Sequence, residues 1–257
     1  MKAIFSNWIE PQNENWNTGY RTMEEFLIGL EISVKLASQH YECHFAGDPF
    51  SCGIVTSKNL PFYSIQTLDF SKAPKGLWNY SKLLACSVFE PPFIHIDNDV
   101  FVSKILPDFD DYLFQNTEHL DGYPFYDKPI GLMKHLDLPE NIFNLNNRVA
   151  SNCGIIGIKR KELVDEWINP VIDFVHTHDF KNLKLQRPDI LFEIVIEQFT
   201  ANCSINYHKR KSKYLLKNEL ESDAIKTGYC HMVSSTKRND FNFNRIKKFY
   251  EQNIKKQ

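Results

Sequence analysis

The 257-residue sequence predicts an α/β fold in which helices cover both faces of a mostly parallel sheet. Strand-like and helical segments alternate over the first hundred residues, as expected for parallel strands joined by crossover helices. Two further apolar runs, 93–96 and 152–158, have the length and composition of buried strands. There is no internal repeat, so we expect one domain at 1–240 with an elaborated C-terminal half, followed by a basic helix or tail at 241–257.

The charge balance argues against nucleic acid as a partner. Thirty Lys and Arg residues face thirty-two Asp and Glu residues, which gives a net charge of −2. A chain that is nearly neutral has no overall field to attract a polyanion. Apolar residues make up 42 % of the chain, an ordinary share for a globular protein.

Six cysteines are scattered along the chain, and none is spaced as CxxC. This spacing argues against a structural zinc site. The N-terminal residues lack the pattern of a signal peptide, and no apolar run approaches the roughly 20 residues of a membrane span. We therefore expect reduced cysteines and a cytoplasmic location.

The first half begins with a strand and a helix. Thr22 opens the pattern TMEE, a capping box that predicts a helix over 23–39. A turn follows at 47–49, and the segments 51–57 and 62–70 are interpreted as a second series of strands and loops. The remaining predictions for this half are strands at 2–8, 41–46 and 93–96 and a helix at 76–89.

The second half begins with a long segment, 106–150, that is rich in Asp, Asn, Pro and Tyr and is predicted to be irregular. Loops of this length in compact domains are often functional. Helices are predicted at 161–176, with a break or kink at Pro170, and at 189–200. The basic stretches 208–217 and 245–256 fit solvated surface, or contact with an anionic acceptor or a membrane face.

The strongest chemical signal is the segment FIHIDNDVFV at 93–102. A hydrophobic strand is followed at once by Asp97 and Asp99, two carboxylates that repel each other when they lie close together. A divalent cation removes that repulsion, and oxygen ligands favour Mg²⁺ or Mn²⁺. An ordinary Asp-Asn-Asp turn after a strand is the alternative.

This segment resembles the DxD strand of GT-A-fold glycosyltransferases, especially the glycogenin-like and bacterial lipopolysaccharide galactosyltransferase-like groups. The segment LWNYSKLLACS at 77–87 resembles the preceding helix, with Lys82 as the basic residue that reaches the donor. SNCGIIGIKR at 151–160 resembles the strand that lines the donor-sugar pocket, with Asn152 and Gly154 at the matching positions. GYCHMVSSTKRN at 228–239 resembles the late segment that carries a metal-binding histidine, His231, and a phosphate-binding lysine, Lys237.

The resemblance implies a GT-A-like, Rossmann-type sheet and a nucleotide-sugar donor. It implies that Asp97, Asp99 and His231 hold Mn²⁺ or Mg²⁺, and that Asp97 also contacts the donor. The expected donor is a UDP-sugar, and the expected acceptor is a glycan, a lipid-linked molecule or another hydroxyl compound. The Trp that usually follows the late lysine is absent here, because Arg238 and Asn239 follow Lys237.

An inverting enzyme of this kind would need a carboxylate base beside the acceptor hydroxyl. Glu193 and Glu197 are spaced i and i+4, so they share one face of the predicted helix. The candidates from the sequence are Asp127, Asp189, Glu193 and Glu197. The groups that the chain resembles retain the configuration of the sugar and need no such base, so both stereochemical outcomes stay open.

Three other functions fit parts of the pattern. A phosphohydrolase of the haloacid dehalogenase type also places DxD after a strand, but Phe101 stands where such enzymes usually have Thr or Val. A nucleotidyltransferase would be expected to have a glycine-rich basic loop after the first strand, and none is present. A non-catalytic domain that binds a sugar or a partner predicts no dependence on metal.

Overall fold

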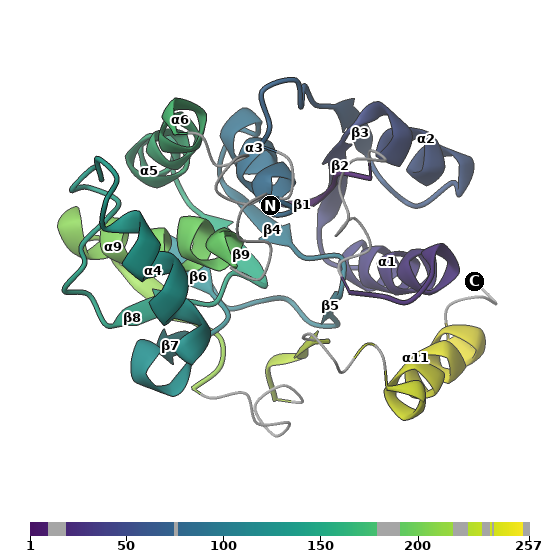
Figure 1. The fold of residues 1–257 in the computed structure, drawn as a ribbon. Helices are drawn as coiled ribbons and strands as arrows, with labels where there is room; N and C mark the ends of the chain where they lie inside the picture. The colour runs from purple at the N-terminus through teal and green to yellow at the C-terminus, as the bar shows by residue number, and fades with distance from the viewer. Residues whose placement is uncertain are drawn as a thin grey trace.

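A seven-stranded sheet forms the centre of the protein in the computed structural model, which describes residues 1–9, 19–74, 77–178, 191–217, 226–232, 237 and 239–253 (Figure 1). The strand order is β10-β6-β9-β4-β1-β2-β3. The strands are β1 (Lys2–Asn7), β2 (Glu42–Gly47), β3 (Ser64–Thr67), β4 (Phe93–Ile96), β6 (Tyr112–Phe114), β9 (Ile155–Ile158) and β10 (Ser212–Tyr214).

The sheet is mostly parallel, as the sequence predicts. Strand β1 pairs in parallel with β2 and β4, β2 with β3, and β10 with β6. Strand β9 runs antiparallel to both β4 and β6. The chain passes to opposite sides of β1 when it forms β2 and β4, and in open α/β sheets such a switch point leaves a crevice at the carboxyl ends of the strands.

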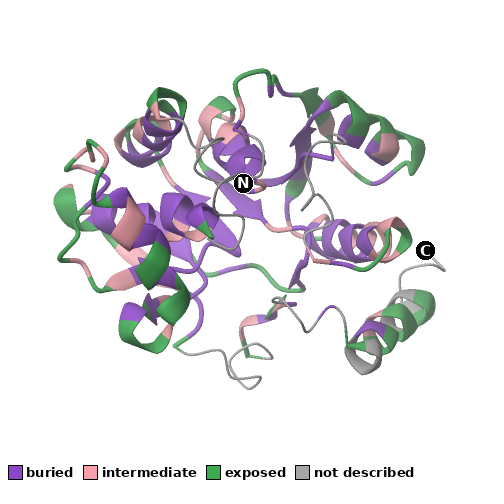
Figure 2. Ribbon diagram, in the orientation of Figure 1, coloured by how far each residue is buried: buried purple, intermediate pink, exposed green. Residues whose placement is uncertain are grey.

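Successive side chains of a strand point to opposite faces of the sheet. In the central strands, the side chains on both faces are buried, and they belong to two different hydrophobic clusters. In β1, Ile4 packs into one hydrophobic cluster, whereas Ala3 and Phe5 pack into another. In β4, Phe93 joins the first cluster and Ile94 the second. Figure 2 shows the buried strands between helices whose outer turns are exposed.

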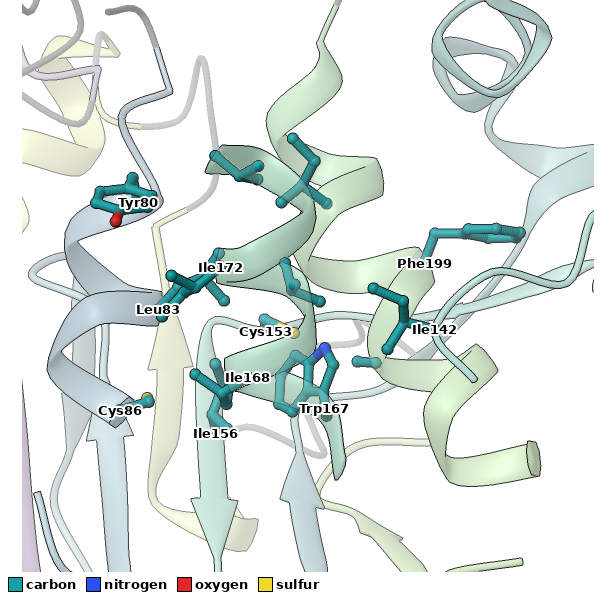
Figure 3. Close-up of a cluster of buried hydrophobic side chains, with 14 of the residues drawn as sticks. Tyr80, Leu83, Cys86, Ile142, Cys153, Ile156, Trp167, Ile168, Ile172 and Phe199 are labelled. Carbon is teal, nitrogen blue, oxygen red and sulfur yellow. The ribbon is translucent and has the colours of Figure 1, made fainter. Parts of the chain in front are cut away.

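The first cluster lies between the sheet and the helices of the middle and second half of the chain. Figure 3 shows Leu83 of α3 (Tyr80–Val88) beside Ile172 of α6 (Asn169–Thr177), with Ile156 of β9 and Trp167 below them. All four side chains are 9 % exposed or less. This packing fixes α3, and with it Lys82, against the sheet.

The two predicted helices of the second half each contain a π-helical turn. The first consists of α5 (Lys161–Leu163), a π turn (Val164–Ile168) and α6, and Pro170 lies in the first turn of α6. Residues 161–177 are helical throughout, so the chain has no break at Pro170, which lies just after the π turn. The second consists of α8 (Phe192–Ile194), a π turn (Val195–Phe199) and α9 (Thr200–Tyr207); residues 189 and 190 lie outside the described residues.

The opposite face of the sheet is covered by α1 (Met23–Ala37) and α2 (Pro49–Ser57), and α11 (Asp240–Asn253) packs against α1. The predicted cap of α1 is confirmed, because the Thr22 hydroxyl accepts a hydrogen bond from the Glu25 N–H at 3.1 Å. Phe243 of α11 belongs to the same hydrophobic cluster as α1. The basic stretch that begins at residue 245 thus lies on a helix that packs against the main domain.

The prediction of a strand at 51–57 is wrong, because these residues form most of α2. The Asp48 carboxylate accepts hydrogen bonds from the N–H groups of Phe50 and Ser51, at 3.2 and 3.4 Å, and Pro49 occupies the first turn. A capping Asp followed by Pro starts a helix. This local signal outweighs the β-branched residues that follow it.

The prediction that 106–150 is irregular is also wrong in part. This segment contains β6, which lies between β9 and β10 in the main sheet. It also contains short strands β7 (Thr117–His119) and β8 (Val149–Ser151), two 3₁₀ turns (Leu120–Gly122 and Pro124–Tyr126) and helix α4 (Asp127–Met133). Strands of three residues are too short to show a hydrophobic period.

Two small antiparallel ribbons flank the carboxyl ends of the central strands. Strand β5 (Val100–Val102) pairs with β11 (Tyr229–His231), and His231 lies opposite Val100. Strand β7 pairs with β8, and Glu118 lies opposite Ala150. The ribbons therefore bring segments from distant parts of the sequence to the crevice beside β1 and β4.

Candidate functional site

A cavity of about 570 Å³ lies at the carboxyl ends of β1 and β4. Its wall includes Ser6 and Asn7 from the end of β1, and Asp97, Asn98 and Asp99 from the turn after β4. The cavity thus lies at the switch point of the sheet, beside the carboxyl ends of β1 and β4. Of the site residues predicted from the sequence and described in the structure, all except Asp127 line this cavity.

Asp97, Asp99 and His231 form a cluster that could hold a metal ion. One ligand atom from each residue lies within 4.8 Å of the others. The β5–β11 ribbon brings His231 beside the DxD turn, and the Met232 N–H donates to the Asp99 carbonyl oxygen at 3.0 Å. Two carboxylates and one imidazole suit Mg²⁺ or Mn²⁺, so the residues fit the predicted cation.

Lys82 is held in a buried ion-pair network beside Asp97. Its Nζ lies 2.7 Å from Asp97 Oδ1 and 2.5 Å from Glu197 Oε1, and it donates to the Cys153 carbonyl oxygen at 2.9 Å. The ammonium group therefore donates hydrogen bonds to Asp97 and to the Cys153 carbonyl oxygen, and it is ion-paired with Glu197. The Lys82 side chain is only 5 % exposed. Lys82 is thus bonded to Asp97 and also lines the cavity, and its contact with a donor stays a prediction.

The two aspartates of the cluster differ in acidity. Burial raises the pKa of Asp97 to about 6, with Lys82 acting against the rise and Asp99 adding to it. Burial also acts to raise the pKa of Asp99, but Lys237 and His231 outweigh it and hold the pKa below its usual value. Asp99 therefore loses its proton at a lower pH than Asp97 does, because Lys237 and His231 lie beside it.

Lys237 lies in the cavity wall and forms an ion pair with Asp99. Its Nζ also lies 5.6 Å from the centre of the Tyr20 ring. The residue is buried, so bulk water screens its charge only weakly. Lys237 thus places a positive charge directly beside the candidate metal ligands.

Asn152 and Gly154 lie together on the segment between β8 and β9. The Asn152 Oδ1 accepts a hydrogen bond from the Gly154 N–H at 3.0 Å, and its Nδ2 donates to Glu118 Oε1 at 2.7 Å. Glu118 Oε2 accepts from the Tyr126 hydroxyl at 2.7 Å. This chain of hydrogen bonds fixes the Asn152 amide at the wall of the cavity.

The candidate bases occupy different environments. Asp127 is exposed in the first turn of α4 and does not line the cavity, so the structure does not bring it together with the other candidates. Glu197 lines the cavity but is ion-paired with Lys82 and accepts from Asn79 Nδ2 at 3.1 Å. Glu193 is fully buried in the cavity wall. Asp189 lies outside the described residues.

Sequence reasoning missed several polar residues at the site, among them Gln115, Glu118 and Asn79. Gln115 directly follows the apolar triplet of β6, and its amide contacts His231. An apolar run that ends in polar residues is the same signal that singled out the DxD turn. It was overlooked here because the surrounding segment was interpreted as irregular.

Substituting Gly154 by alanine should weaken cation binding and destabilise the protein. A Cβ at this position would lie 2.6 Å from both Gln115 Oε1 and His231 Nδ1, so the His231 ring must move. We expect a loss of about 1–3 kcal/mol in the free energy of unfolding and a higher dissociation constant for Mn²⁺. Calorimetric titration and thermal unfolding measure the two effects.

Gly53→Ala is the matched control, because a Cβ at Gly53, within α2, meets no atom within 4 Å. Alanine is the better helix former, so this variant should be as stable as the parent or slightly more stable. Equal Mn²⁺ affinity in the parent and in Gly154→Ala would contradict the packing of His231 over Gly154.

The fold and site define a mixed α/β protein with a candidate metal cluster in a cavity at the switch point of its sheet. A family model matches residues 1–255, and the chain belongs to that family, which is described as a family of unknown function (DUF6734). No curated protein matches the chain.

One solved structure that matches is 4-diphosphocytidyl-2C-methyl-D-erythritol synthase from Anaerococcus prevotii. The alignment covers 88 % of this chain and 93 % of that one, with 9 % sequence identity and a TM-score of 0.37. A likeness this weak carries no argument about the function of this chain. Among the described residues, no helix is both long and apolar enough to cross a membrane.

Proposed function

We propose that the protein is a metal-dependent glycosyltransferase that transfers a sugar from a nucleotide-diphosphate sugar, with a UDP-sugar as the expected donor, to a hydroxyl group. The acceptor would be a glycan or a lipid-linked molecule. One observation carries the proposal: His231, far from the DxD turn in sequence, has a ligand atom within 4.8 Å of one from each of Asp97 and Asp99, in the cavity at the carboxyl ends of β1 and β4. Lys237 adds a positive charge at the same place.

The proposed chemistry needs positive charge where the diphosphate leaves, because negative charge grows on its oxygen in the transition state. Mn²⁺ or Mg²⁺ held by Asp97, Asp99 and His231 would act there as a Lewis acid. Lys237 would add a point charge next to it. Lys82 keeps the Asp97 carboxylate in place, and Asn152, fixed by Glu118, would orient the sugar through hydrogen bonds.

A thermal-shift comparison of nucleotides with and without Mn²⁺ tests this proposal. We expect UDP to raise the melting temperature when Mn²⁺ is present and to have little effect alone, because the cation would link the diphosphate to the carboxylates. Adenosine and guanosine diphosphates serve as controls for the base. A shift with UDP that needs no metal, or no shift at all, would favour a non-catalytic binding domain.

Product analysis separates the proposal from its two enzymatic rivals. Incubation with a UDP-sugar and Mn²⁺ should release UDP, with the sugar transferred to an acceptor or to water. A phosphohydrolase would instead release inorganic phosphate from phosphate esters, and a nucleotidyltransferase would release pyrophosphate from a nucleoside triphosphate. If the protein releases only inorganic phosphate or only pyrophosphate, the glycosyltransferase proposal is wrong and the corresponding rival enzyme is supported.

A further inference from the structure

The Gln115 side chain lies behind His231, on the side of the ring away from Asp99. Its Oε1 is 2.6 Å from His231 Nδ1 and 2.7 Å from the Tyr229 hydroxyl. A carbonyl oxygen has no hydrogen to donate, so both partners must donate to it. The ring hydrogen of neutral His231 is therefore on Nδ1, and the lone pair is on Nε2.

The other edge of the ring faces the candidate metal ligands. His231 Nε2 lies 3.5 Å from Asp99 Oδ1. A neutral imidazole binds a metal through the nitrogen that carries no hydrogen, and the hydrogen bond at the other nitrogen decides which one that is. The Gln115 contact thus leaves the nitrogen that faces Asp99 available as a ligand.

Gln115 is itself rigidly placed. It is 2 % exposed, its N–H donates to the Asn152 carbonyl oxygen at 3.1 Å, and its carbonyl oxygen accepts from the Leu216 N–H at 2.8 Å. Gly154 lies against both the amide and the ring, since a Cβ there would come within 2.6 Å of each. The amide and the imidazole therefore pack together against the Gly154 backbone on one side.

We propose that Gln115 is a positioning residue of the metal site, which fixes the tautomer and the direction of His231 so that Nε2 points at the cation. This inference rests on the metal site that the proposed function uses, but not on the identity of the donor. It assigns a role to a residue at the end of β6 that belongs to no motif found in the sequence.

Paired variants at position 115 test the proposal through Mn²⁺ binding, measured by the electron paramagnetic resonance signal of free Mn²⁺. Gln115→Leu removes the acceptor at nearly constant volume and should raise the dissociation constant roughly 10- to 100-fold. Gln115→Glu keeps an acceptor oxygen at the same reach. This variant should therefore bind Mn²⁺ more tightly than Gln115→Leu does. Gln66→Leu, on the exposed strand β3, is the control and should not change the affinity.

A packing role for Gln115 predicts the opposite order, because leucine suits a buried site and a buried glutamate does not. Equal Mn²⁺ affinity in Gln115→Leu and the parent, or weaker binding in Gln115→Glu than in Gln115→Leu, overturns the assignment. Thermal unfolding of each variant shows that the binding data come from folded protein.

Histidine ring ¹⁵N shifts provide a second measurement that needs no metal and no donor. The parent should show His231 with its hydrogen on Nδ1, and Gln115→Leu should show a mixture of tautomers or the Nε2–H form. If the parent binds no Mn²⁺, the proposed function loses its metal, and the tautomer measurement alone decides the role of Gln115. An unchanged Nδ1–H tautomer in Gln115→Leu overturns that role.

Discussion

Asp99→Asn should lower the Mn²⁺-dependent turnover of the donor by roughly a hundred- to thousandfold, the usual cost of losing one electrostatic stabiliser of a transition state. The substitution keeps the shape of the side chain but removes the charge that faces His231 and Lys237. It should also weaken Mn²⁺ binding. Release of UDP from a UDP-sugar and calorimetric titration of Mn²⁺ measure the two effects.

Asp108→Asn is the control for that experiment, because the Asp108 side chain is 88 % exposed and pairs with Lys159 on the surface. Surface ion pairs contribute little, so this variant should keep the parent turnover. A parent-like turnover in Asp99→Asn, with Mn²⁺ still required, would show that the reaction uses a cation held elsewhere. The proposed site would then be wrong.

Lys82→Met should lower the free energy of unfolding by about 3–5 kcal/mol, because it leaves two carboxylates without their buried cation. Glu197 is 1 % exposed and Asp97 is 20 % exposed, so water cannot replace the ammonium group well. Methionine fills a similar volume, which limits the effect of lost packing. Denaturant unfolding measures the change, and the exposed Lys161→Met, from an i,i+4 pair with Asp165, should cost less than about 1 kcal/mol.

A second substitution separates the effect of charge from that of shape. Adding Glu197→Gln to Lys82→Met removes one of the stranded carboxylates, so the double variant should be more stable than Lys82→Met alone. If the double variant loses the sum of the two single effects, Lys82 and Glu197 do not interact in the folded protein. The buried network described above would then be incorrect.

The sequence predicted the parts of the protein that depend on neighbouring residues. The apolar run before Asp97 has the length of a buried strand, and it forms β4 with Asp97 directly after it. The capping pattern at Thr22 marked the start of α1 for the same reason, because a cap acts within one helical turn. The resemblance that joined His231 to the DxD turn was also useful, since both line one cavity.

Other features could not be found in this way because they depend on contacts between distant residues. Lys82 and Glu197 are ordinary charged residues in helical segments until the fold brings them to 2.5 Å from each other. Gln115 acquires its contact with His231 only when β6 and β11 lie beside the same turn. Asp127 lies in a long polar segment, which makes it a candidate from the sequence, but that segment folds so that Asp127 is exposed.

The β5–β11 ribbon has a consequence for how the chain holds itself together. It joins a strand that directly follows the DxD turn to one that begins at Tyr229, near the end of the chain. A cation bound by Asp97, Asp99 and His231 would link the DxD turn to β11. By mass action, it would favour the state in which β11 is paired with β5. Proteolytic nicking of the region around residues 226–232 should therefore slow when Mn²⁺ is added.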